Sequence, residues 1–89
     1  METTLNFTKK GEIWEASYIS SGNTVIQLER GKPGEVKIFA NLGGMKRVEV
    51  NRYENFYNSV TIFNIDMPKG VEVTVTSATE VNEAKILTE

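Results

Sequence analysis

The sequence predicts an all-β fold: a small antiparallel β-sandwich of seven or eight short strands, with a partly closed β-barrel as the alternative. Apolar and polar residues alternate with a period of two along most of the chain. Valine, isoleucine and threonine are frequent in these segments, and turn-forming residues separate them. With 89 residues the chain can build one hydrophobic core but not two, so we expect a single domain over residues 1–89.

Four of the expected strands lie in the first half of the chain, at residues 4–8, 12–20, 24–30 and 35–41. In each of them every second residue is apolar, so one face of the strand can pack on a core while the other meets solvent. These apolar faces consist of Leu5 and Phe7; Trp14, Ala16 and Tyr18; Ile26 and Leu28; and Val36, Ile38 and Ala40. Because each face needs a cover, a second sheet is required. We therefore expect Trp14 in the core; the alternative is an exposed tryptophan that stacks on a sugar, which would support carbohydrate binding.

Two further strands are expected at residues 60–66 and 71–77. The later one is the clearest of all, with valines at alternate positions and Glu or Thr between them. In the earlier one either Val60 and Ile62 or Phe63 and Ile65 can face the core. For residues 77–89 we favour a turn followed by a C-terminal strand. The apolar residues there fit neither the period of a strand nor that of a helix, and the segment is short for an unsupported helix.

Turn signals fall between these segments. They are Lys10-Gly11, residues 21–23, residues 31–34, Gly43-Gly44 and residues 67–70. Glycine allows the positive φ that tight hairpins need, and both prolines lie outside strand centres. The spacing of the turns is typical of a sandwich or barrel.

Several kinds of chemistry are excluded by composition. The chain has no cysteine and no histidine, so it has no disulfide, no thiolate nucleophile and no Ser-His-Asp site. No glycine-rich phosphate loop is present, and most glutamates alternate outward on strands, where solvated carboxylates are usual. Asp66 is the only aspartate and precedes a proline turn. We expect no catalytic residue, no metal site and no cofactor, and hence no enzyme.

Charge and hydropathy limit the partners. The net charge is −2, and the basic residues at Lys9-Lys10 and at Lys46, Arg47 and Arg52 are interspersed with glutamates, so we expect no nucleic-acid binding. No apolar run is long enough to span a bilayer, and the polar N-terminus lacks the apolar region of a signal peptide. We expect no membrane association. We expect the protein to be synthesised in the cytoplasm without a signal peptide.

The segment 51–58 is the main candidate binding site. It combines aromatic rings with amides at Tyr53, Asn55, Phe56, Tyr57 and Asn58. The alternation of the flanking segments does not extend through it, so we expect a loop. Rings bury area at low entropic cost and amides satisfy polar groups, which suits a protein contact or a glycan. The alternative is that the rings cap the end of the sandwich.

Phe39 is a second candidate. It lies between Ile38 and Ala40, so the register that turns those two inward places Phe39 on the outer face. An outward phenylalanine on a strand indicates a contact surface.

Three stretches, "LNFTKKGEIWEASY", "IQLERGKPGEVKIF" and "DMPKGVEVTVTSATEVNEAKI", together resemble small all-β proteins of tailed phages and prophages of gut Bacteroidetes. The resemblance spans most of the chain in outline, but does not extend to residues 51–59. It implies a non-enzymatic virion-associated or accessory protein that assembles with copies of itself or with a structural partner. Our hypothesis is therefore a structural or interaction module; the alternative is a carbohydrate-binding module that uses the loop at 51–58.

Overall fold

The computed structural model describes residues 1–56 and 60–88, and every regular element in them is a β-strand. The nine strands are β1 (Glu2–Thr4), β2 (Thr8–Lys10), β3 (Ile13–Ile19), β4 (Asn23–Arg30), β5 (Gly34–Asn41), β6 (Val48–Phe56), β7 (Val60–Asp66), β8 (Glu72–Ser77) and β9 (Val81–Thr88). The all-β prediction is confirmed, with one strand more than expected.

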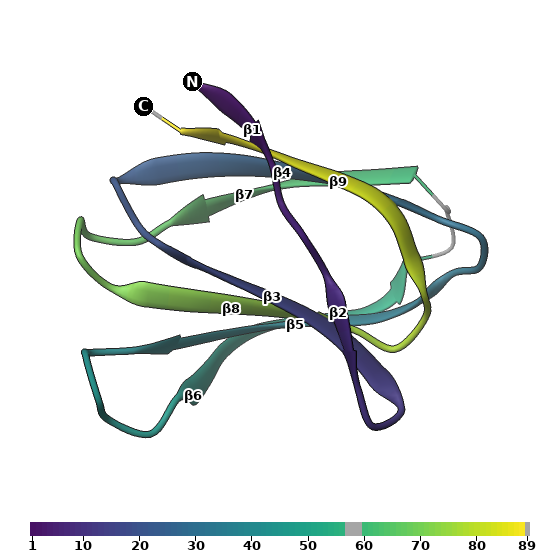
Figure 1. Cartoon of the computed structure of the whole chain (residues 1–89), viewed down its shortest axis with the longest axis horizontal. Helices are drawn as coiled ribbons and strands as arrows, with labels where there is room; N and C mark the ends of the chain where they lie inside the picture. The colour runs from purple at the N-terminus through teal and green to yellow at the C-terminus, as the bar shows by residue number, and fades with distance from the viewer. Residues whose placement is uncertain (57–59, 89) are drawn as a thin grey trace.

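The strands form two antiparallel sheets that face each other (Figure 1). One sheet has the order β1-β9-β4-β7 and the other the order β2-β3-β8-β5-β6. None of the strands in the described residues joins the two sheets into a closed ring, so the sandwich is confirmed and the barrel alternative is wrong.

The core lies between the sheets and is built from the alternating faces that the sequence indicates. Its most deeply buried apolar side chains come from the central strands β4, β5 and β8: Ile26, Leu28, Val36, Ile38, Val73 and Val75. In β7 the structure selects one of the two possible faces, since Phe63 and Ile65 are buried. The C-terminal strand predicted after the turn is confirmed as β9.

The N-terminal segment differs from the prediction of one strand over residues 4–8. β1 pairs with β9 in one sheet and β2 pairs with β3 in the other, so residues 5–7 cross between the layers. The alternation is nevertheless correct, because Leu5 is buried and Phe7 packs against the core. Leu5 N–H donates to the Ala84 carbonyl at 3.0 Å, which holds the crossing segment to β9.

The loop predicted from residue 51 onward is also wrong in part, because residues 48–56 form β6. β6 shifts register twice against β5, between Gly34 and Val36 and between Ile38 and Phe39. Each shift inserts an extra residue, so inward and outward positions no longer alternate along the sequence. The strand was missed for that reason.

Candidate functional site

The two predicted site residues whose side chains the structure describes, Tyr53 and Phe39, lie on opposite faces of the five-stranded sheet. Tyr53 lies opposite Val36 and packs against the core, with its ring centroid 5.3 Å from that of Phe63. Asn55 and Phe56 belong to β6 by their backbone, but their side chains, together with Tyr57 and Asn58, lie outside the described residues. Tyr53 is therefore part of the packing between the sheets.

Phe39 lies on the outer face of the five-stranded sheet, as the register predicts, but an arginine covers it. The Arg47 guanidinium carbon is 4.5 Å from the ring centroid, and Arg47 Nη1 donates to Glu15 Oε2 at 2.9 Å. Phe39 is half-buried as a result. The ring and its neighbours also shield Thr74, which lies opposite Phe39 on β8 and is almost fully buried although it points outward.

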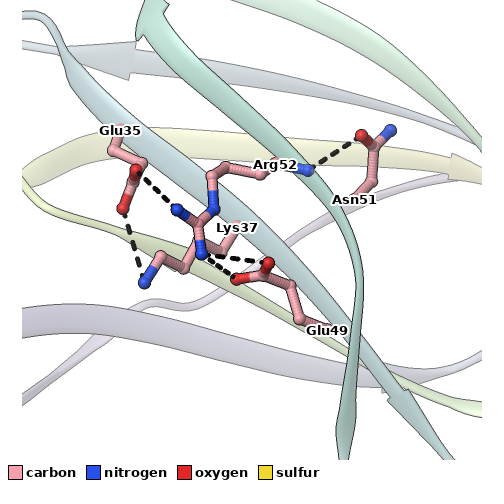
Figure 2. Close-up of polar contacts among 5 residues, drawn as sticks. All are labelled: Glu35, Lys37, Glu49, Asn51 and Arg52. Atoms are coloured by element: carbon pink, nitrogen blue, oxygen red, sulfur yellow. Dashed lines mark hydrogen bonds and ion pairs between the residues drawn. The ribbon is translucent and has the colours of Figure 1, made fainter.

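A network of charged side chains covers the same face on β5 and β6 (Figure 2). Arg52 Nη2 donates to both carboxylate oxygens of Glu49, at 3.0 and 3.1 Å, and Arg52 Nη1 is 3.9 Å from Glu35. Lys37 Nζ is 3.5 Å from the same Glu35. Two cations and two carboxylates thus balance one another. Because the charges neutralise one another, we interpret this network as a solvated surface and not as an ion-binding site. Exposed ion pairs of this kind contribute little to the stability of the fold.

The four-stranded sheet carries an apolar stripe on its outer face, formed by Val25, Val60, Ile62 and Leu87. Val60, Ile62 and Leu87 are 52%, 65% and 50% exposed. Val25 lies opposite Leu87 across β4 and β9, and Ile62 of β7 lies diagonal to Val25. The stripe borders a shallow hollow of about 330 Å³. Charged side chains surround it: Glu2, Glu29, Glu83 and Lys85.

β7 is the least protected of the four edge strands. β1 and β2 have three residues each and carry Glu2, Lys9 and Lys10. β6 shifts register twice and bears the charged network. β7 has seven residues, pairs with β4 without a shift, and carries no charge before Asp66. Short edges, charges and bulges are the usual protection against edge-to-edge pairing, and β7 has only Asp66 at its end.

A second hollow, of about 380 Å³, lies at the end of the sandwich where the β4–β5 and β8–β9 turns meet. Its lining residues are Trp14, Gly31, Lys32, Ala78, Thr79, Glu80 and Asn82. Trp14 shares a strand face with Ala16 and Tyr18 as predicted, yet it is only half-buried and lines this hollow. We refer to it below as the end hollow.

A buried arginine ties the two turns of the end hollow together. Arg30 is 3% exposed, and its Nη1 donates to the Gly34 carbonyl at 3.0 Å and, at 3.4 Å, to the hydroxyls of Ser77 and Thr79. The Thr79 hydroxyl in turn donates to the Lys32 carbonyl at 3.0 Å. Burial lowers the pKa of Arg30 from its ordinary value, because the charged guanidinium loses hydration there.

Neither the apolar stripe nor the end hollow was predicted from the sequence. The apolar stripe has a visible signal, since β7 has β-branched or aromatic residues on both faces, which indicates that the outward set is exposed. The end hollow depends on residues far apart in the sequence, so no local pattern indicates it.

Among residues 1–56 and 60–88, no group of three or more acidic, histidine or cysteine side chains could hold a metal ion. The described chain also contains no helix with the length and hydrophobicity of a transmembrane segment. Comparisons with protein-family models, with curated proteins and with solved structures gave no match.

Proposed function

We propose that the chain is a non-enzymatic interaction module that associates with a second copy of itself through the free edge of β7. The observation that carries the proposal is the character of this edge: seven residues in regular register, uncharged up to Asp66, with Val60 and Ile62 exposed. The outer N–H and C=O groups of an edge strand form a template for another strand.

A two-fold axis suits the distribution of charge along β7. In an antiparallel pair of β7 strands the two Asp66 carboxylates lie at opposite ends of the new contact, so like charges do not meet. The uncharged segment around Ile62 then lies at the centre, where each copy supplies the same β-branched side chains. A contact of this kind is self-complementary and closes after two copies.

Edge pairing is also favoured over stacking of the two outer faces. If the apolar stripes of two copies were laid face to face, Glu2, Glu29 and Glu83 of one copy would approach the same residues of the other. Lys85 is the one cation among the residues that line this hollow, and it already lies 3.5 Å from Glu2. Pairing along β7 leaves these carboxylates in solvent and extends the stripe across both copies.

The resemblance to small phage proteins supports the same class of function, since it implies assembly with like copies or a structural partner. A place in a virion stays a prediction. Self-association through β7 does not depend on it.

The test is the oligomeric state of the purified chain, measured by sedimentation velocity over a range of concentrations. We expect a monomer–dimer equilibrium for the wild type and a monomer for Ile62→Lys, because a lysine at this exposed position blocks edge pairing without disturbing the core. Ile19→Lys is the matched control, since Ile19 is 62% exposed on the other sheet. It should dimerise like the wild type.

A wild-type chain that stays monomeric at high concentration would contradict the proposal. So would a dimer that Ile19→Lys weakens and Ile62→Lys does not, because the contact would then lie on the five-stranded sheet.

A further inference from the structure

We propose that the end hollow is a saccharide-binding site in which Trp14 provides the stacking surface. The ring lines the hollow from β3, the strand next to edge strand β2 in the five-stranded sheet. Pyranose rings have an apolar face that packs on aromatic rings and hydroxyls around the periphery that need hydrogen-bond partners. The end hollow offers both in one place.

The polar groups around Trp14 include donors and acceptors. Asn82 contributes an amide, Glu80 a carboxylate and Lys32 an ammonium group. Within the described part of the chain, the side chains of Glu80 and Asn82 make no hydrogen bond or ion pair to protein, so they are available to a ligand. Lys9 lies over the Trp14 ring, with its Nζ 5.5 Å from the ring centroid, and adds a donor beside the stacking surface.

The floor of the end hollow is held in place before any ligand arrives. Thr79 accepts from buried Arg30 and donates to Lys32, and its N–H donates to the Ser77 hydroxyl at 3.3 Å. Gly34 approaches so closely that an added Cβ would lie 2.9 Å from the Thr79 methyl. A site fixed by such contacts loses little conformational entropy on binding, which matters for ligands that form weak individual contacts.

The mixture of charges favours a saccharide over a phosphate-rich ligand. Glu80 lies among the lining residues together with Lys32, so the hollow has no strong positive field to attract a polyanion. Its volume of about 380 Å³ is also at the small end of ligand sites and suits one or two sugar rings rather than a long chain. The site uses no residue of β7 and does not depend on self-association.

The chain contains one tryptophan, so its fluorescence reports on this site directly. We would titrate the protein with soluble hexamers of β-1,4-linked glucose, β-1,4-linked N-acetylglucosamine, β-1,4-linked xylose and α-1,4-linked glucose. We expect a saturable change in tryptophan emission with at least one of them. Isothermal titration calorimetry then gives the affinity for the wild type and its variants.

Asn82→Ala should weaken binding by about tenfold, the effect of losing one hydrogen bond to the ligand. Trp14→Phe keeps an aromatic side chain, but should also weaken binding, because the stacking area shrinks. Asn64→Ala is the control, since Asn64 is an exposed asparagine on β7, outside the end hollow. Its affinity should equal that of the wild type.

Absence of any fluorescence or calorimetric response to all of the hexamers would overturn the proposal. Binding that Asn82→Ala leaves unchanged would do the same, as would equal losses in Asn82→Ala and Asn64→Ala. Because Asn82 is exposed, its replacement leaves the fold intact, and circular dichroism checks this for each variant.

Discussion

Polar side chains at the margin of the core form a short relay between the two sheets. The Tyr18 hydroxyl is 2.9 Å from the Thr24 hydroxyl, and Thr24 Oγ1 donates to the Ile65 carbonyl at 3.2 Å. Tyr18 belongs to one sheet, while Thr24 and Ile65 belong to the other. Burial raises the pKa of Tyr18, and the hydrogen bond with Thr24 opposes this to a smaller extent.

This pKa shift makes stability depend on alkaline pH. Unfolded Tyr18 ionises near its ordinary pKa of about 10, whereas the folded protein keeps it neutral to higher pH. The unfolded state therefore gains from ionisation first, and stability should fall as pH rises through about 10. Urea unfolding of the wild type and Tyr18→Phe between pH 8 and pH 11 checks this. The loss should be smaller in Tyr18→Phe, and identical pH profiles would contradict it.

At the scale of elements, the β4–β5 and β8–β9 turns are packed together through Gly34 and Thr79. A Cβ at Gly34 would lie 2.9 Å from Thr79 Cγ2 and 3.3 Å from Thr79 Oγ1. Gly34 does not have a positive φ, so its need for glycine is steric and not conformational.

We therefore expect Gly34→Ala to destabilise the protein by about 1–3 kcal/mol, the usual cost of overpacking. Adding Thr79→Ser should restore part of that loss, because serine removes the methyl group in the clash and keeps the hydroxyl that Arg30 and Lys32 use. Gly43→Ala is the control, since nothing lies within 4 Å of its added Cβ. Chemical denaturation of the wild type, these variants and the Thr79→Ser single variant gives the free energies of unfolding, and additive effects of Gly34→Ala and Thr79→Ser would refute the contact.

Elements could be predicted from the sequence where the alternation is uninterrupted. β4, β5 and β8 have an apolar residue at every second position, so Ile26, Val36 and Val73 could be placed in the core without a structure. β6 could not be predicted, because its two register shifts place Val50 in solvent and Tyr53 inward. The prediction of the candidate site was affected in the same way. Tyr53 was predicted to be a binding residue because the strand that turns it toward the core was not recognised.

The position of Tyr53 gives a further test of β6. Replacing Tyr53 with alanine removes a ring that packs on Phe63, and should destabilise the protein by about 2–4 kcal/mol, less than the loss of a fully buried ring. Val50→Ala, on the same strand but 46% exposed, should cost well under 1 kcal/mol. Equal, small effects in thermal melting would place Tyr53 on the surface and contradict the packing described here.

At the scale of the whole molecule, the small core and the edge strands of the sandwich together determine how the protein behaves. A chain of 89 residues has a limited core, so its stability is modest and its edges matter. Three of its edges are short, charged or bulged, whereas β7 is regular and carries Val60 and Ile62 in solvent. An unprotected edge lowers the solubility of a monomer. The proposed contact between two copies would cover this edge.

Such a contact couples stability to protein concentration. A partner that binds the folded state and not the unfolded state stabilises it by mass action, so Tm should rise by several degrees once the concentration exceeds the dissociation constant of the dimer by about a hundredfold. Ile62→Lys should lose this dependence and keep the Tm of the dilute wild type, whereas Ile19→Lys should retain it. Differential scanning calorimetry over a range of concentrations measures all three. If Tm of the wild type does not change with concentration, β7 carries no copy of the chain under those conditions and the dimer proposal fails.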